Sequence, residues 1–216
     1  MNDKKYTKEK PNQIEYDDYL DKGPYKMGPW TSWIYRSDPR HLVFTLSRYK
    51  FASKIFSNKK SLIEFGGGDS FGAPILLQEV EKLDVLDFEP LVMENVNDFH
   101  DKDLLKKINY KIVDFTNNIE FDKKYDAALS LDVIEHINID QEKIYMENIK
   151  KSLSDDGICL IGTPNKEASK FANPIAAQTH INLKTTNDLL KLSNDYFKNS
   201  FIFSMNDEVV HTGYHG

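Results

Sequence analysis

The sequence predicts an α/β fold in which a mostly parallel sheet carries helices on both faces. Two observations predict it. From residue 61 onward, short apolar runs alternate with segments of helical period, which is typical of consecutive βαβ units. The first apolar run ends in a glycine-rich string, residues 66–72, of the kind that joins a strand to a helix and lets backbone approach a ligand.

The bulk properties of the chain restrict its function. A chain of 216 residues suits a single domain covering 1–216. The formal net charge of −6 and the pI near 5.5 argue against a nucleic-acid partner, which usually meets a basic surface. The N-terminus has no apolar core of a signal peptide, and no run is long enough to span a membrane. We therefore expect a cytoplasmic protein without membrane contact.

We interpret residues 1–39 as an N-terminal arm or lid and residues 40–216 as the cofactor-binding core. The first 24 residues are polar, apart from a possible helical turn at 14–20. Aromatic residues then gather before the core: Trp30, Trp33 and Tyr35. They are expected to cover the cofactor, to stack on a ring or sugar of the acceptor, or to pack on the core. We expect Asp38 and Pro39 to begin a helix as its N-cap and first residue.

The core elements follow in order from apolar periodicity and turn residues. We predict strands at 61–65, 84–88, 109–115, 125–131, 158–163 and 199–205. We predict helices at 73–83, 89–99, about 140–153 and 185–197, with a loop at 154–157 and a cap at Thr185 or Thr186. Residues 208–216 are either a short last strand or a tail.

The glycine turn indicates a ligand that carries a positive group. Gly66, Gly67 and Gly68 follow the first strand, and Glu64 stands two residues before them. A carboxylate at this place repels a pyrophosphate but accepts hydrogen bonds from an ammonium group. The dinucleotide fingerprint GxGxxG also requires glycine at position 71, which is Phe71 here.

Two further acids end the next predicted strands. Asp87 ends the second strand, 21 residues after Gly66, where α/β cofactor folds bind both ribose hydroxyls. Asp114 ends the third strand, where its carboxylate could accept from the amino group of an adenine. Together with Glu64, these acids predict a ligand that is a nucleoside carrying an amino acid.

These motifs, with YDAALSLDVIEHI and LIGTPN, resemble class I S-adenosylmethionine-dependent methyltransferases, especially small-molecule O-methyltransferases. The resemblance covers about residues 40–205 and implies a Rossmann-like fold with S-adenosyl-L-methionine as cofactor. It implies that Glu64 and the glycines hold the methionine end and Asp87 the ribose, while Asp114 and Phe115 hold adenine. Phe88 and Leu131 complete the predicted cofactor site.

Two departures from this family pattern are visible. Ser70 stands where the family has its third glycine, and serine is small enough to be tolerated there. The last, antiparallel strand of the family's sheet is expected to be short or missing, because the chain offers little sequence for it.

The segment after the fourth strand contains the candidate base. A helix starting there would place Asp132, Glu135 and His136 on one face, since they stand at i, i+3 and i+4. We assign His136 as first and His180 as second candidate for the catalytic base. Our assignment includes no metal ligand. The trio also resembles a divalent-metal site of ubiquinone-pathway O-methyltransferases, and simple helix capping is a further alternative.

The acceptor is predicted less directly. Methyltransferases of nucleic bases or glutamine resemble one another in an Asp/Asn-Pro-Pro-aromatic string, which is absent after the fourth strand, so these acceptors are disfavoured. Asn165 and the loop to His180 are expected to border the acceptor, and Arg36 and Arg48 could meet a carboxylate on it. We predict methyl transfer to a hydroxyl (or amine) of a small molecule or saccharide, by a possible homodimer. An NAD-dependent oxidoreductase and a non-catalytic, methyltransferase-like binding module remain the alternatives.

Overall fold

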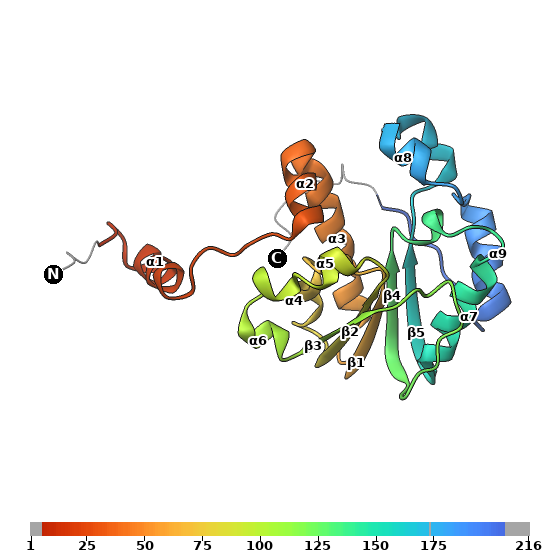
Figure 1. The fold of residues 1–216 in the computed structure, drawn as a ribbon, viewed down its shortest axis with the longest axis horizontal. Coiled ribbons are helices and arrows are strands. Elements are labelled where there is room, and N and C mark those ends of the chain that lie inside the picture. Colours follow the sequence, from red (N-terminus) through yellow and green to blue (C-terminus); the bar gives the residue numbers. More distant parts are fainter. Residues whose placement is uncertain (1–5, 173, 206–216) are drawn as a thin grey trace, which may run out of the picture.

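A computed structural model describes residues 6–172 and 174–205 (Figure 1). Its sheet has five strands in the order β3-β2-β1-β4-β5, and every neighbouring pair is parallel. The strands are β1 (Ser61–Phe65), β2 (Lys82–Asp87), β3 (Ile108–Ile112), β4 (Tyr125–Leu131) and β5 (Leu153–Gly162). The prediction of a Rossmann-like α/β fold is confirmed, and within the described ranges the sheet has no antiparallel strand.

Helices surround this sheet (Figure 1). The α-helices are α1 (Lys10–Lys22), α2 (Pro29–Ser37), α3 (Pro39–Ile55), α4 (Ala73–Leu76), α5 (Pro90–Met93), α6 (Lys102–Leu105), α7 (Glu142–Ser152), α8 (Pro174–Thr179) and α9 (Thr186–Tyr196). Three short 3-10 helices join them: η1 (Val96–Asp98), η2 (Ile134–His136) and η3 (Lys166–Phe171). In the described residues, no helix is both long and apolar enough to cross a membrane.

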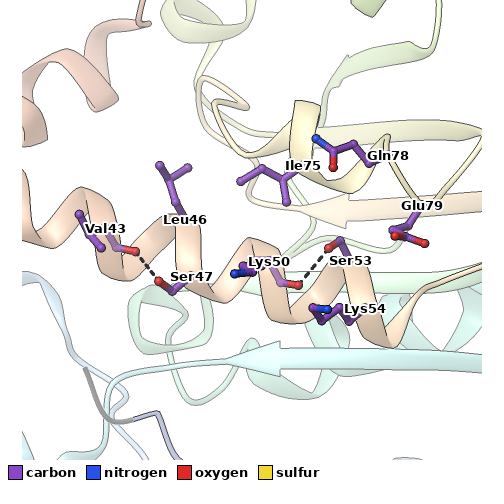
Figure 2. Close-up of a pocket in the computed structure, with 9 residues that line it drawn as sticks. All are labelled: Val43, Leu46, Ser47, Lys50, Ser53, Lys54, Ile75, Gln78 and Glu79. Carbon is purple, nitrogen blue, oxygen red and sulfur yellow. Dashed lines mark hydrogen bonds between the residues drawn. The ribbon is translucent and has the colours of Figure 1, made fainter. Parts of the chain in front are cut away.

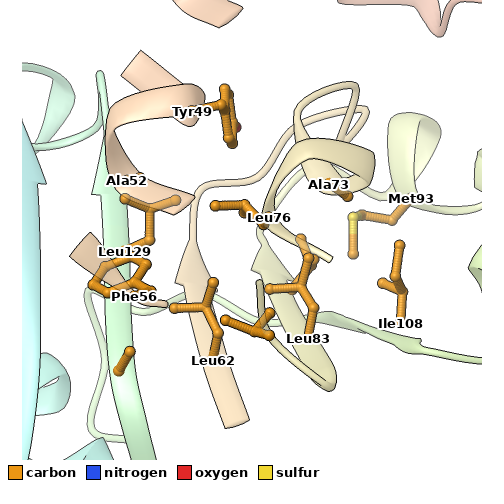
Figure 3. Packing of buried hydrophobic residues seen from close by; sticks show 13 residues of the cluster. Tyr49, Ala52, Phe56, Leu62, Ala73, Leu76, Leu83, Met93, Ile108 and Leu129 are labelled. Atoms are coloured by element: carbon orange, nitrogen blue, oxygen red, sulfur yellow. The ribbon is translucent and has the colours of Figure 1, made fainter. Parts of the chain in front are cut away.

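The sheet separates two hydrophobic clusters, because successive strand residues point to opposite faces. On one face, α3 and α4 pack on the sheet through side chains that are almost fully buried (Figure 3). Tyr49 of α3 and Phe56, which directly follows α3, contribute the aromatic part of this cluster, and Leu62 and Leu83 contribute the strand side. On the other face, α7 packs through Tyr145 and its neighbours against the alternate strand residues. Both faces are thus covered, as a parallel sheet requires.

The central strands agree with the sequence prediction, but both edges of the sheet differ from it: β3 ends at Ile112 rather than at 115, and β5 begins before its predicted start. The strands predicted at 61–65 and 125–131 have the predicted bounds. The loop predicted at 154–157 is wrong, because β5 begins at Leu153, pairs with Tyr125 and passes an irregularity before its apolar part. The strand predicted at 199–205 is also wrong, since this segment has no regular structure. Residues 208–216 lie outside the described residues.

Several helices are shorter than predicted. The helix predicted at 73–83 ends at Leu76, because Val80 is buried in the core and the chain must return to begin β2 at Lys82. The helix predicted at 89–99 is divided into α5 and η1. The cap predicted at Thr185 is confirmed: its hydroxyl accepts from the backbone of Asp188, whose side chain accepts in return.

The N-terminal segment contains more helix than the sequence indicated. The possible turn at 14–20 is part of α1, a 13-residue helix without a buried residue. Figure 1 shows α1 standing away from the body of the molecule. Pro39 begins α3 as predicted, although the side chain of Asp38 makes no capping hydrogen bond. The aromatic segment forms α2, which packs beside α3 (Figure 1).

Candidate functional site

The carboxyl ends of β1, β2 and β4 meet at one edge of the sheet, which is where parallel α/β folds bind ligands. The glycine loop leaves β1 at this edge. Gly66 and Gly68 have φ values of 78° and 53°, in the left-handed region that favours glycine. A side chain on Gly66 would also lie 2.3 Å from Val133. Ser70 also has a positive φ, 52°. A glycine, which the family has at this position, would adopt this conformation without strain.

Glu64 lies beneath the loop and is 1% exposed. The Tyr49 hydroxyl donates to its Oε1 over 2.7 Å, whereas no described residue donates to its Oε2. Burial raises the pKa of this carboxyl to about 7, although the bond from Tyr49 opposes the shift. The buried, half-satisfied carboxylate is chemically suited to receive a cationic donor from a ligand, because leaving a buried acceptor unpaired is costly.

Asp87, at the end of β2, holds the loop in place. Its Oδ2 accepts from the backbone N–H of Gly68 over 2.8 Å, and its Oδ1 accepts from the N–H of Glu89 over 3.0 Å. Each carboxylate oxygen can accept a second hydrogen bond, so the ribose role predicted for Asp87 stays chemically possible. The side chain is only 7% exposed, so the surrounding residues hold it in one orientation at the carboxyl end of β2.

The N-terminal segment is fastened to the same loop. Asp69 accepts from both the backbone N–H and the hydroxyl of Thr31, each over 2.8 Å, and so places negative charge at the start of α2. Trp30 would lie 3.0 Å from a Cβ on Gly68. Trp33 and Tyr35 lie on α2, which packs beside α3, and about half of each side chain remains exposed. The predicted role of α2 as a lid stays a prediction.

His100 and Tyr25 add a second attachment of the same segment. One imidazole nitrogen, Nε2, lies 3.1 Å from the carbonyl oxygen of Asp69, and Nδ1 lies 2.9 Å from the Tyr25 hydroxyl. Burial lowers the pKa of His100. A neutral imidazole with Nε2 protonated satisfies both bonds, because it donates to the carbonyl and accepts from the hydroxyl.

The residues predicted to hold adenine lie beyond β3, which ends at Ile112 rather than at 115. Asp114 is exposed, and its carboxylate accepts from Thr116 and Asn117 within its own loop. Phe115 is buried against Phe65 and Tyr145, so it supports this wall from inside the core.

The two remaining predicted cofactor residues differ in exposure. Phe88 is 65% exposed just after β2, beside the ribose-binding position predicted for Asp87. Leu131 ends β4 and packs against Gly162 of β5. Neither the adenine role of Asp114 and Phe115 nor these two assignments is tested by the geometry.

The predicted helix face with three polar residues is wrong. Asp132 precedes η2 with φ 54° and binds Arg48 over 2.5 Å, whereas η2 is a single 3-10 turn that contains Glu135 and His136. Arg48 is therefore engaged with a carboxylate of its own chain, and Arg36 is exposed on α2. A 3-10 turn does not place residues i, i+3 and i+4 on one face as an α-helix would.

Glu135 is fully buried in η2. The Thr163 hydroxyl donates to its Oε2 over 3.0 Å, while its buried Oε1 has no partner among the described residues. Burial, assisted by the charge of Asp132, raises the pKa of Glu135 to about 7. Its environment thus repeats that of Glu64: one oxygen held by a hydroxyl, the other oxygen unpaired.

The structure brings His136 and His180 together, although they are far apart in the sequence. Their rings lie 4.9 Å apart between centroids at an angle of 79°. Nδ1 of His136 lies 3.1 Å from the carbonyl oxygen of Thr179. A carbonyl only accepts, so Nδ1 carries the proton and Nε2 presents its lone pair in the neutral ring. Burial, with the neighbouring His136, lowers the pKa of His180 and favours its neutral form.

Glu135, His136 and His180 can together hold a divalent cation. Their ligand atoms all lie within 4.8 Å of one another. Two neutral imidazoles and a carboxylate are a common donor set for such ions, and the unpaired Oε1 of Glu135 gives the set a buried anionic member. This trio differs from the one that the sequence suggested, since His180 takes the place of Asp132.

A buried polar cluster supports the loop that carries His180. Asn182 donates its backbone N–H to the carbonyl of Glu135 over 3.0 Å and its side-chain amide to Glu142 over 2.7 Å. Lys184 pairs with Glu142 over 2.5 Å and donates to the side-chain oxygen of Asn182. The loop is therefore tied both to η2 and to α7, which fixes the position of His180.

Sequence reasoning missed several of these site residues: Thr31, Tyr49, Asp69, His100, Thr163 and Asn182. Asp69 stands inside the glycine-rich string 66–72, and an acid within this turn was a visible signal in the sequence. Tyr49 and Thr163 act through hydroxyls, and hydroxyl residues in helices and strand ends are too common to stand out. Their role follows only from the tertiary contact.

A family model described as a methyltransferase domain matches residues 35–196, which is most of the chain. A ubiquinone biosynthesis O-methyltransferase of Rickettsia bellii is 35% identical over 75 residues. That match covers 35% of this chain and 30% of the relative, so it spans less than a third of the relative's length.

Solved structures resemble the fold. The methyltransferase domain of bacterial CtHen1-C has a TM-score of 0.59 at 19% identity, over 70% of this chain and 84% of that one. The N-methyltransferase NodS from Bradyrhizobium japonicum WM9, in complex with S-adenosyl-L-homocysteine, has a TM-score of 0.51 at 16% identity, over 76% and 83%. At these identities the likeness concerns the fold alone.

Proposed function

This chain belongs to the methyltransferase domain family, and we propose that it transfers a methyl group from S-adenosylmethionine to a hydroxyl (or amine) of a small molecule or saccharide. The observation that carries this proposal is Glu64 beneath the glycine loop. Its buried Oε2 lacks a partner among the residues described, and Gly66 and Gly68 of the loop above it have positive φ. The ammonium group of a methionine moiety fits that position, whereas a pyrophosphate would be repelled.

The cofactor roles follow the same edge of the sheet. Asp87 is oriented by Gly68 and Glu89 and keeps acceptor capacity for the ribose hydroxyls. Asp114 stays the proposed acceptor for the adenine amino group. When bound, the cofactor supplies a methyl group on a sulfonium, which is already a good leaving group. The chain's own residues therefore need to hold the acceptor in line and take its proton.

His136 is the proposed base. Its Nδ1–H is fixed on the Thr179 carbonyl, and its exposed ring presents Nε2 with a free lone pair. With the cofactor bound, the acceptor oxygen would take the methyl group as its bond to sulfur breaks, and Nε2 of His136 would accept the acceptor proton and release it to solvent. His180, held neutral beside it, would keep the acceptor hydroxyl oriented.

A divalent cation is the second possibility for the same trio, and the unpaired Oε1 of Glu135 favours it. Such an ion would be held by Glu135, His136 and His180 and would lower the pKa of an acceptor hydroxyl bound to it. Titration of the apoprotein with Mn²⁺ by calorimetry distinguishes the two roles. Binding that is lost in Glu135→Gln supports the metal role, and no binding leaves His136 as a base.

The two alternatives, an NAD-dependent oxidoreductase and a non-catalytic binding module, are tested differently. An NAD-dependent oxidoreductase would need a pyrophosphate close to Glu64. A non-catalytic module would bind S-adenosylmethionine without turnover. We would incubate the protein with methyl-labelled S-adenosylmethionine and a panel of phenols, catechols, sugars and primary amines. Label transferred to a hydroxyl compound is the expected result. Transfer to amines alone would select the amine form of the proposal, and transfer to no compound of the panel or of a metabolite extract would contradict it.

A further inference from the structure

A groove lies between α3 and α4, on the side of these helices that faces away from the sheet (Figure 2). Its volume is about 490 Å³. Figure 2 shows Leu46 of α3 and Ile75 directed into the space between the two helices. Val43 extends this apolar strip, and Lys50 and Lys54 line the groove along α3. The groove therefore has an apolar strip with two lysines along α3, and the carboxylate of Glu79, which accepts from the Ser57 hydroxyl, lines it beyond α4. Neither lysine has an ion-pair partner among the described residues.

The helix α1 has the complementary character. It stands away from the body, and none of its residues is buried. A free helix of 13 residues is marginal in water, so packing against another surface would stabilise it. Its Tyr16 and Tyr19 stack on each other, and Leu20 is 59% exposed beside them. These three side chains form a stripe on one side of the helix, as the advance of about 100° per residue requires.

The charges and lengths of the two surfaces match. Glu15 and Asp17 fall on either side of the Tyr16–Leu20 stripe, and the helix has four acidic residues against two lysines. The groove side presents Lys50 and Lys54. At a rise of about 1.5 Å per residue, α1 is about 20 Å long and the groove-lining part of α3 is about 17 Å long.

We propose that this protein forms an arm-exchanged homodimer in which α1 of each copy lies in the α3–α4 groove of the other. The two-fold exchange makes the same contact twice, which brings two small contacts toward the size of a stable interface. The linker after α1 is fastened to its own body at Tyr25 and Thr31, and from there α1 extends outward rather than into its own groove. This inference does not depend on the proposed methyl transfer.

Charge reversal on each surface tests the exchange. In one variant Glu15 and Asp17 become lysines (E15K/D17K), and in the other Lys50 and Lys54 become glutamates (K50E/K54E). Each variant alone then presents like charges at both contacts and is expected to be monomeric by light scattering after gel filtration. The wild-type protein is expected to be dimeric. K150E, at an exposed position of α7 on the other side of the sheet, serves as the control and is expected to stay dimeric.

An equimolar mixture of the two variants makes the test specific. Acidic arms then meet basic grooves and basic arms meet acidic grooves, so the mixture is expected to form heterodimers. A monomeric wild-type protein, dimers that persist in both variants, or a mixture that stays monomeric would each overturn the proposal. If the wild type is dimeric but the mixture stays monomeric, the dimer contact does not pair α1 with the α3–α4 groove. Far-UV circular dichroism confirms that the variants, changed at exposed or half-buried positions, are folded.

Discussion

The two sides of the site each contain one buried glutamate, and the comparison between them separates their functions. Glu64 at β1 and Glu135 in η2 both have a pKa raised to about 7 by burial. In both, a hydroxyl donates to one carboxylate oxygen, and the other oxygen is buried without a partner among the described residues. The surroundings differ: Glu64 faces a glycine loop, whereas Glu135 lies beside two imidazoles.

This difference indicates which ligand each carboxylate can receive. Beneath the glycine loop, backbone approaches closely and a compact cation such as an ammonium group can replace the missing donor. Beside His136 and His180, the carboxylate can share a metal ion or support a base. Under the proposed function, the same carboxyl chemistry would serve cofactor binding on one side and acceptor activation on the other.

The largest expected effect is on the acceptor side. His136→Ala should lower turnover roughly 100-fold or more, because it removes the proposed base or metal ligand. The affinity for S-adenosylhomocysteine should stay unchanged, since His136 belongs to the other side of the comparison. Turnover is measured on the acceptor found in the labelled panel, and binding by calorimetry. Normal turnover would return His136 to a structural role.

The next effect is on the cofactor side. Asp87→Ala should weaken cofactor binding by about 1 to 3 kcal/mol, the typical cost of losing charge-assisted hydrogen bonds. Part of this loss would come from the loop, because Asp87 also accepts from Gly68 and Glu89. The amide of Asp87→Asn keeps one acceptor and provides the matched comparison. Unchanged affinity in the alanine variant would remove Asp87 from the cofactor site.

The stability of the apoprotein should depend on pH through both glutamates. An unfolded glutamate titrates near 4.5, whereas the folded Glu64 titrates near 7, so the folded state binds more protons between these values. The free energy of unfolding should therefore fall as pH rises from about 5 to 7, by about 2 kcal/mol for each buried glutamate.

Urea unfolding of the wild type and of Glu64→Gln measures this dependence. The variant cannot titrate at this position, so its fall in stability should be smaller by the share of Glu64. Glu135→Gln provides the same test on the other side of the site. If all three proteins have parallel pH profiles, neither carboxyl has the raised pKa on which the comparison depends.

The smallest expected effect is at the adenine position. Asp114→Ala should weaken cofactor binding by about 0.5 to 1 kcal/mol, since the side chain is exposed and its acceptors are already used within its loop. A loss as large as that of Asp87→Ala would show that the loop at Asp114 rearranges on the cofactor. Calorimetry of both variants under one set of conditions makes the comparison direct.

The cofactor side could largely be predicted from the sequence, because its residues follow apolar strands directly. Glu64 and the glycines are local to one strand and its turn, and Asp87 ends the next strand as the pattern indicated. Asp114 was placed less well, because β3 ends earlier than its apolar residues suggested. The alternation of strands and helices is likewise a local pattern, and it predicted the parallel sheet.

The acceptor side could not be predicted in the same way, because it is assembled from distant segments. Glu135 lies in η2, Thr163 follows β5, and His180 is held by a loop tied to α7 through Asn182. A helical spacing argument joined Asp132 to Glu135, but the chain forms a 3-10 turn there and Asp132 binds Arg48 instead. Pairings over such sequence distances leave no local pattern.

One titration tests the central claim that Glu64 receives the ammonium of S-adenosylmethionine. The apoprotein is titrated by calorimetry with S-adenosylmethionine, S-adenosylhomocysteine and NAD, near pH 6 and near pH 8, in buffers of different ionisation enthalpy. We predict micromolar binding of the first two compounds alone, tighter at the higher pH, with proton release near pH 6 as the ammonium lowers the pKa of Glu64. Binding of NAD alone, or of none of the three compounds, would contradict the account. So would binding of S-adenosylmethionine that releases no proton and has the same affinity in Glu64→Gln.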